Sequence, residues 1–186
     1  YRRTDNPDAL LLTNLDYLQW KRRTDPGFRP YHAPEGRIGL TQDPYLAALN
    51  KLIAENQSHD ICAEVYLLKA QEAVNAGVPA SGLQLCDEAI SRYPAYHRIN
   101  ALRELKQDIL SPDFTVQTPS AVYPGEEFDL KVSFKNLKSF AVQLYAINLS
   151  ARPNAVEVPD ETFLKKYGRL LSSVHYVLFP SGDYKM

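Results

Sequence analysis

Two cysteines and two histidines between residues 59 and 97 are the side chains best suited to hold a metal ion. Cys62 follows His59 by three residues, and Cys86 and His97 come later. Thiolate and neutral imidazole are the ligands that tetrahedral zinc selects. The sequence around them lacks the paired ligands of a zinc knuckle, and both cysteines fall in helical patterns, where a small buried thiol is the ordinary outcome. We therefore expect no metal site.

Ser58, His59 and Asp60 carry the side-chain types of a nucleophilic triad. They are consecutive, however, whereas the members of such a triad meet in space from separate elements, and Asp60 is better explained as a helix cap. Phosphate-binding glycine loops, the metalloprotease pattern and the serine nucleophile elbow are absent from the sequence. An enzyme that uses His175 or Tyr176 stays an alternative that no arrangement of residues supports. We expect no enzyme, no catalytic or cofactor-binding residue and no cofactor.

The charged residues are expected to lie on the solvated surface or to stabilise the ends of helices. The basic run Lys21-Arg22-Arg23, with Arg2, Arg3 and the aromatic Tyr17 and Trp20 nearby, offers a phosphate or an acidic partner a contact, but cations at a helix C-terminus also stabilise the helix dipole. The acidic residues at a predicted turn and on a strand's solvent face are Glu126, Glu127 and Asp129. The triplets that begin at Asn56 and Asn148 match the glycosylation pattern by chance. With a formal net charge of −1, we expect no nucleic-acid partner and no small-molecule substrate.

The first part of the chain has helical periodicity. The chain has 186 residues, of which 45% are hydrophobic, so it can bury a core, and nowhere do about 18 consecutive apolar residues occur. Apolar spacings of three and four, with Asn, Asp or Ser before them, predict five helices. These are expected from Asn6 to about Arg23, from Asp43 to Asn56, from Asp60 to Gly77, from a capping box at Ser81–Gln84, and from about Tyr96 to Leu110. Residues 25–40 are expected to form a loop, and the helices to pack as antiparallel hairpins.

Two of these helices repeat each other. The apolar positions of residues 46–53 recur in residues 83–90 at a constant offset of 37. The spacing of the tetratricopeptide pattern is occupied by Tyr66, Ala70, Gly82, Cys86, Ala89 and Pro94. Small residues allow neighbouring helices to approach closely, and proline ends the hairpin. The pattern predicts a helical-hairpin array, which serves as a scaffold or a peptide-binding surface more often than as a catalyst.

At Pro112 the hydrophobic period changes from helical to two. Residues 114–116, 128–134, 140–146 and 174–179 alternate as strands do, and we expect the second and third to form an antiparallel hairpin around the turn 136–139. Residues 123–126 predict a further turn, and residues 160–171 a helix. The fold class is thus α+β, with a helical domain over 1–111 and an antiparallel β-sandwich domain over 112–186. Four strands are too few for a closed sandwich, so the second domain is expected to be truncated.

One family has a similar succession of segments. A helical region that leads through Ile109-Leu110-Ser111-Pro112 to Phe114-Thr115-Val116, then to Val122-Tyr123-Pro124-Gly125-Glu126-Glu127-Phe128 and Lys131-Val132-Ser133-Phe134-Lys135-Asn136-Leu137, resembles the N-terminal part of bacterial alpha-2-macroglobulin-like proteins. In that family a tetratricopeptide-like leader precedes the first macroglobulin domain. The later strand Ala141-Val142-Gln143-Leu144-Tyr145-Ala146-Ile147 is also similar, whereas the helical segment 160–171 departs from the pattern.

The resemblance implies a non-catalytic scaffold or interaction segment of a large peptidase-trapping inhibitor in the cell envelope, periplasmic or surface-exposed. Its expected partners are the other domains of the same long chain and the peptidases that the whole protein traps. No Cys-Gly-Glu-Gln-type thioester surrounds Cys62 or Cys86, so neither cysteine takes that role. The alternative is a stand-alone tetratricopeptide-like module that binds a protein or a peptide in the groove of its repeat.

Overall fold

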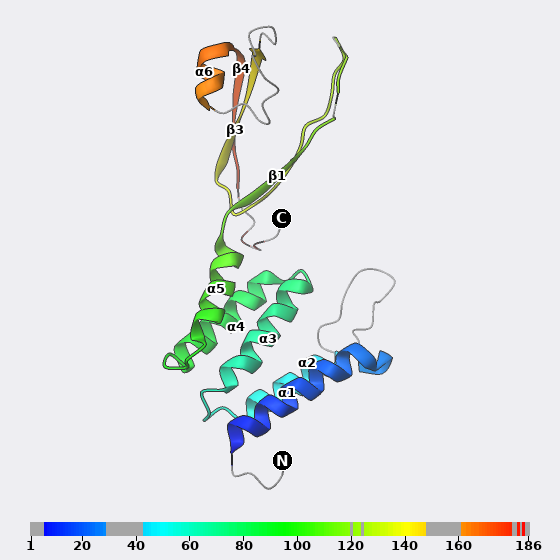
Figure 1. Cartoon of the computed structure of the whole chain (residues 1–186), viewed down its shortest axis with the longest axis vertical. Coiled ribbons are helices and arrows are strands. Elements are labelled where there is room, and N and C mark those ends of the chain that lie inside the picture. Colours follow the sequence, from blue (N-terminus) through cyan, green and yellow to red (C-terminus); the bar gives the residue numbers. More distant parts are fainter. Residues whose placement is uncertain are drawn as a thin grey trace. The chain divides into compact units, whose positions relative to one another are not determined.

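The computed structural model describes residues 6–28, 43–119, 121–123, 125–147, 161–179, 182 and 184 (Figure 1). The chain divides into two compact units, which are described separately below. The helical unit covers residues 1–112 together with 182–186, and the β unit covers residues 113–181. An α+β fold is confirmed. Of the predicted loop 25–40, the described part ends in a short 3-10 helix, η1 (Pro26–Phe28), and the rest lies outside the described residues.

All five predicted helices are present in the helical unit. They are α1 (Pro7–Thr24), α2 (Pro44–Glu55), α3 (Cys62–Asn75), α4 (Pro79–Arg92) and α5 (Ile99–Leu110). Gly77, at a φ of +73°, ends the α3 segment and lets α4 fold back on it. No helix among the described residues combines the length and the apolar character that a membrane span needs.

Of the five predicted helix starts, those at Asn6 and Asp43 are confirmed, whereas α5 begins at Ile99, three residues after the expected Tyr96. Asn6 Oδ1 accepts the backbone N–H groups of Asp8 and Ala9 at 3.1 Å, and Asp43 Oδ1 accepts that of Tyr45 at 2.8 Å. The predicted cap at Asp60 is wrong: Ile61 occupies the N-cap of α3, and no side chain caps this end. A cap supplies acceptors to the first backbone N–H groups of a helix, and here the preceding 3-10-type turn supplies them instead. The backbone N–H of Cys62, for example, already donates to the His59 carbonyl oxygen at 3.0 Å.

The capping box predicted at Ser81–Gln84 is also wrong. Helix α4 begins at Pro79, and its N-cap is Val78, three residues before the predicted cap Ser81 and without a side-chain bond. Proline at the first helical position has its φ already set and has no N–H to satisfy, so the helix can begin there without a polar cap. Ser81 therefore lies inside the first turn.

The helical unit has a continuous core drawn from all five helices. The fully buried large side chains are Leu11, Tyr45, Leu49, Cys62, Val65, Cys86 and Leu102. Close helix contact depends on small residues between α3 and α4. A Cβ placed on Gly82 would lie 3.0 Å from Val74 Cγ2 and 3.1 Å from the Ala70 carbonyl oxygen, so only a residue without a side chain fits there without displacing its neighbours.

The β unit consists of two separate antiparallel ribbons (Figure 1). Strand β1 (Asp113–Gln117) pairs with β2 (Lys131–Lys135), and β3 (Ser139–Ile147) pairs with β4 (Gly168–Val177). The predicted hairpin between the second and third strands is therefore wrong. Alternation fixes which face of a strand is apolar but does not select the strand beside it. The short connection 136–138 takes the chain from one ribbon into the other.

The boundaries within the β unit also differ from expectation. Residues 128–130 lie outside β2, and helix α6 (Glu161–Tyr167) ends four residues before the predicted Leu171. At Gly168 a Cβ would lie 2.6 Å from the Leu164 carbonyl oxygen, so only glycine allows α6 to pass directly into β4. The turn predicted at 123–126 is confirmed, because the Glu126 N–H donates to the Tyr123 carbonyl at 3.1 Å and Gly125 has a φ of +85°.

Candidate functional site

The two thiols are buried separately and serve as core packing. Cys62 and Cys86 are both inaccessible to solvent, and the Cys62 Sγ lies 4.0 Å from the Ile53 carbonyl oxygen. Burial raises the pKa of the Cys62 thiol and raises that of Cys86 to about 11, so both thiols keep their protons at a higher pH than an exposed thiol does. Within the described part of the chain, no three His, Cys, Asp or Glu side chains are grouped closely enough to hold a metal ion.

The described histidines are His59, His97 and His175, and each lies in a different setting. His59 Nδ1 lies 3.8 Å from Asp8 Oδ1, which joins the start of α1 to the turn before α3. His97 packs edge-on against Tyr96, with ring centroids 4.5 Å apart. His175 is exposed on β4, opposite Ala141 of β3. None of these contacts joins a histidine to a nucleophile, as a Ser58-His59 arrangement would require.

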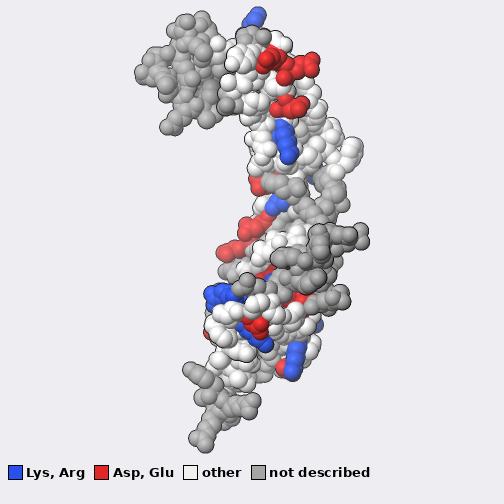
Figure 2. Space-filling view, turned by 90° about the vertical axis from the view of Figure 1, so that its right-hand side faces the viewer, with Lys and Arg blue, Asp and Glu red and all other residues white. Residues whose placement is uncertain are grey.

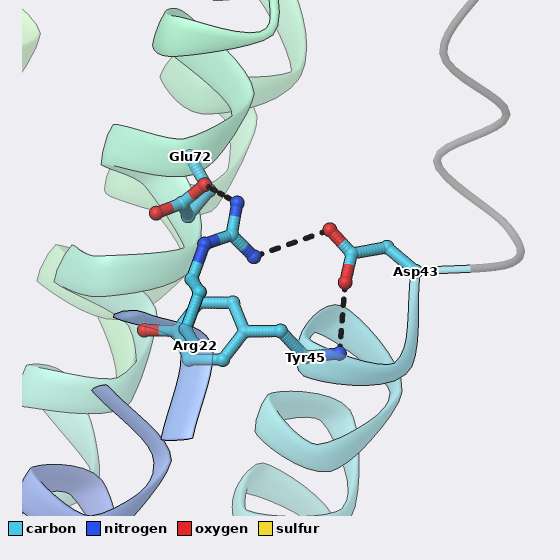
Figure 3. Close-up of polar contacts among 4 residues, drawn as sticks. All are labelled: Arg22, Asp43, Tyr45 and Glu72. Atoms are coloured by element: carbon cyan, nitrogen blue, oxygen red, sulfur yellow. Dashed lines mark hydrogen bonds and ion pairs between the residues drawn. The ribbon is translucent and has the colours of Figure 1, made fainter. Parts of the chain in front are cut away.

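Arg22, in the middle of the predicted basic run, links three helices of the helical unit (Figure 3). Its guanidinium pairs with Asp43 at 3.2 Å and with Glu72 of α3, and it lies over the Tyr45 ring at 4.3 Å from the centroid. The side chain of Asp43 is only 4% exposed. Burial raises the pKa of Glu72, and the Arg22 guanidinium opposes this shift. Two carboxylates thus engage the Arg22 guanidinium within the helical unit and offset its charge there.

Lys21, the neighbouring cation of the basic run, is also engaged. Its Nζ lies over the Phe28 ring at 4.4 Å from the centroid, which holds η1 against the end of α1. On the face shown in Figure 2, basic and acidic residues are interspersed over the described surface. The described part of this face therefore has no stripe of a single charge sign, which is the feature that nucleic-acid binding needs.

The same combination of carboxylate, arginine and tyrosine recurs at two further places in the helical unit. The hydroxyl of Tyr96 donates to Glu64 at 2.8 Å, and Arg98 pairs with the same carboxylate at 3.0 Å. Burial, followed by the hydrogen bond to Glu64, raises the pKa of Tyr96. The side chain of Glu64, on α3, is only 11% exposed. The contacts with Tyr96 and Arg98 therefore offset the cost of burying its carboxylate.

The second repetition joins α3 to α4. Tyr66 donates to Glu88 at 2.6 Å, and Arg92 pairs with Glu88 at 3.3 Å. Each of these clusters links segments that are distant in the sequence, and each satisfies its own charges. They are best explained as clamps that fix the packing of the helices. The sequence analysis did not predict these clusters. It singled out only the basic run that contains Arg22, and the partners of Arg22 are 21 and 50 residues away, beyond the reach of a local pattern.

Of the remaining candidate residues, the acidic group before β2 and Asn56 lie in the described part of the chain. Glu126, Glu127 and Asp129 are exposed and lie in the irregular segment before β2. Asn56 is the C-cap residue of α2, where its side-chain amide donates to the Leu52 carbonyl at 2.8 Å. Asn148 and the Arg2-Arg3 pair lie outside the described residues.

The helical unit has a surface cavity of about 320 Å³ between α2, α3 and α4. Each helix contributes one face to it. The lining residues are Leu46 and Asn50 of α2, Lys69 and Ala73 of α3, and Ser81, Gln84, Leu85 and Glu88 of α4. The spacings of three, four and seven residues are those of one helical face. These residues could have been found from the sequence only if the relative rotation of the three helices had been known.

The β unit has a different kind of surface. In the β1–β2 ribbon, Phe114 pairs with Phe134 and Val116 with Val132, so these four side chains share one face, and Thr115 with Ser133 marks the polar face. Phe114 is nevertheless 59% exposed and Val116 is 47% exposed. The ribbon is amphipathic, but nothing in the described structure covers most of its apolar face.

The β3–β4 ribbon repeats this arrangement. Phe140 is paired with Tyr176 and stacks on it, with ring centroids 5.0 Å apart, and Phe134 approaches Phe140 to 6.5 Å. Farther along the same face, Leu144 is 55% exposed. The two apolar faces thus meet at this aromatic contact, whereas side chains such as Phe114 and Leu144 stay exposed on them. The candidate functional surfaces are the exposed apolar faces of the β unit, its strand edges that have no described neighbour, and the cavity of the helical unit.

Comparison with known proteins gives no relative to guide the assignment: no protein-family model, curated protein or solved structure matches this chain.

Proposed function

We propose that this chain is a non-catalytic assembly segment, consisting of a tetratricopeptide-like helical leader and part of the first macroglobulin-like domain of a peptidase-trapping inhibitor in the cell envelope. The observation that carries the proposal is the open β unit. Its described residues include none that is buried, although its strands alternate apolar and polar side chains as the strands of a sandwich do.

The edges of the ribbons support the same interpretation. A two-stranded ribbon is marginal in water, and three or more strands or a packed layer are needed for independent stability. Here four described strands form two separate pairs, so each strand keeps one edge free of a described neighbour. An exposed apolar face with a free edge is suited to pairing with further strands. The proposed partners are therefore further strands and domains of the same long chain.

The helical unit supports the scaffold part of the proposal. Ala70, Cys86 and Ala89 are fully buried and Gly82 is buried, at the positions where the tetratricopeptide pattern requires close helix contact. Each cluster of Arg, Tyr and carboxylate joins segments of this unit to one another. A unit with a packed core and self-satisfied charges can carry the β unit without a reactive group of its own.

The experiment is to isolate the native product from its source cells with an antibody against the helical unit, and to measure its mass and its effect on peptidases. A trap shields the enclosed peptidase from large substrates but lets small ones enter. We expect a product far above 21.1 kDa that blocks trypsin from casein while leaving the cleavage of a short chromogenic peptide unchanged.

Radiolabelled methylamine, which reacts with thioesters, separates two forms of the proposal. Uptake of label indicates covalent capture, and a large unlabelled product that still shields trypsin indicates entrapment alone. A native product near 21.1 kDa, or a large one that inhibits both substrates equally or neither, would contradict the proposed function.

A further inference from the structure

The cavity between α2, α3 and α4 has the chemistry of a binding site. Its floor is apolar, with Leu46 and Ala73 buried and Leu85 half-buried. Its volume of about 320 Å³ lies at the small end of the range for ligand sites, which begins at about 300 Å³. The cavity is therefore large enough for one or two side chains of a ligand, with polar groups around them.

The polar groups of the cavity differ in whether they are already engaged. Glu88 accepts from Tyr66 and pairs with Arg92, so its charge is satisfied within the unit. Lys69 is half-buried, and its ammonium group has no ion pair with any residue in the described part of the chain. A half-buried cation without a partner attracts an anion. The cavity thus presents one unsatisfied positive charge above an apolar floor.

Two amides complete the arrangement. The side chains of Asn50 and Gln84, on α2 and α4, make no hydrogen bond to another described residue. An amide side chain offers both a donor and an acceptor, which matches the N–H and C=O groups of an extended backbone. A simple carboxylic acid would engage the cation but would leave the amides unused.

We propose that this cavity binds an extended peptide segment that presents a carboxylate side chain to Lys69 and an adjacent aliphatic side chain to the floor formed by Leu46, Ala73 and Leu85. Asn50 and Gln84 hold the peptide backbone between these two anchors. The site lies wholly in the helical unit, and it goes beyond the assembly role, which rests on the β unit. Peptide binding and peptidase trapping can therefore succeed or fail independently.

The test is fluorescence anisotropy of the 186-residue chain with a fluorescein-labelled, C-terminally amidated probe of sequence Gly-Ser-Glu-Leu-Ser-Gly. We expect saturable binding, and a loss of affinity of about tenfold or more in Lys69→Glu, as for the loss of one charge-assisted contact. A probe with Lys in place of Glu should bind Lys69→Glu better than it binds the unaltered chain. This reversal separates a charge contact from general damage to the fold.

Two variants serve as controls. Lys51→Glu changes a lysine on α2 that is outside the cavity and pairs with Glu55 at 3.7 Å, and it should leave binding unchanged. Ser81→Trp places a large ring in the cavity and should abolish binding, while circular dichroism verifies that the helices remain. The proposal is overturned if the probe shows no saturable binding up to about 1 mM. It is also overturned if Lys69→Glu and Lys51→Glu bind the Glu probe equally.

Discussion

The helical unit and the β unit have similar proportions of apolar residues in their elements but bury them very differently. The helices bring Leu49, Val65 and Leu102 to 1% exposure or less. In the β unit, by contrast, Leu144 and Val177 are 55% and 65% exposed. A helix in this chain has neighbours on the side that its apolar stripe faces, whereas each ribbon lacks most of the layer that would cover its apolar face.

This comparison shows that an amphipathic pattern marks the side chains that would be stabilised by burial but does not ensure that the fold buries them. The helical unit buries its apolar side chains through the contacts among its own helices, which clamps such as Arg22 with Asp43 and Glu72 hold in place. In the β unit, the aromatic contacts among Phe134, Phe140 and Tyr176 cover apolar surface only in part, and none of the described residues of this unit is buried. The stability of the chain should therefore be concentrated in the helical unit.

Hydrogen exchange gives the largest contrast. We expect the backbone amides of α3 and α4 to exchange at least about 1,000-fold more slowly than those of β1 and β2, since a local stability difference of about 4 kcal/mol corresponds to that factor. Mass spectrometry of peptides after timed exchange measures both units in one sample. Equal protection of strands and helices would break the comparison, and would also weaken the proposal that the β unit needs further strands.

Truncating a leucine in each unit gives the next largest effect. Leu49→Ala removes a side chain with 0% exposure and should destabilise the helical unit by about 2–5 kcal/mol through lost burial and the cavity left behind. Leu144→Ala, the matched change on the exposed ribbon, should cost well under about 1 kcal/mol. Urea unfolding followed by circular dichroism at the helical wavelength measures the first change, and hydrogen exchange of β3 measures the second. Similar costs in both units would contradict the contrast in burial.

Removing one cation from each unit tests the clamps. Arg22→Met leaves the buried Asp43 carboxylate unpaired and should destabilise the helical unit by about 2 kcal/mol, less than a fully buried pair because Arg22 is 20% exposed. Lys165→Met breaks the exposed pair with Glu161, in which both side chains are more than half exposed, and should change the protection of α6 little. If Arg22→Met unfolds at the same urea concentration as the unaltered chain, the cluster is not a clamp.

The smallest expected effect is a pH dependence that belongs to the helical unit. Burial raises the pKa of Cys86 to about 11 from an ordinary 9.0. Below pH 9 the thiol is protonated in both states, whereas between the two pKa values the unfolded chain loses a proton that the folded chain keeps. Unfolding is therefore favoured as the pH rises from about 9 to 11, by about 1 kcal/mol at pH 10.

The urea midpoints of unfolding at pH 8 and pH 10 measure this loss of stability at alkaline pH. The variant Cys86→Val, which removes the thiol, should reduce the difference between the two midpoints. The same loss in the unaltered chain and in the valine variant would show that other groups, such as Tyr93 with its pKa of about 12, cause it. Slow modification of both thiols by a disulfide reagent at pH 8, with rapid reaction in urea, is the companion measurement.

The sequence alone determined the elements whose causes are local. Asn6 and Asp43 cap their helices as predicted, because a cap requires only residues within one turn, and the turn at 123–126 follows from Gly125 in the same way. The alternation around residues 131–134 and 140–144 correctly indicated strands. The predicted absence of a metal site and of a catalytic residue stays a prediction.

Only the tertiary structure decided which elements are neighbours. The alternation of β2 and β3 fitted a hairpin, yet β2 pairs with β1 and β3 with β4, because strand pairing is a choice among distant segments that alternation does not encode. The clamp of Arg22 with Glu72 spans 50 residues, and the cavity around Lys69 depends on the rotation of three helices about their axes. Such features arise from packing between elements, whose geometry is set by the whole set of side chains at each interface.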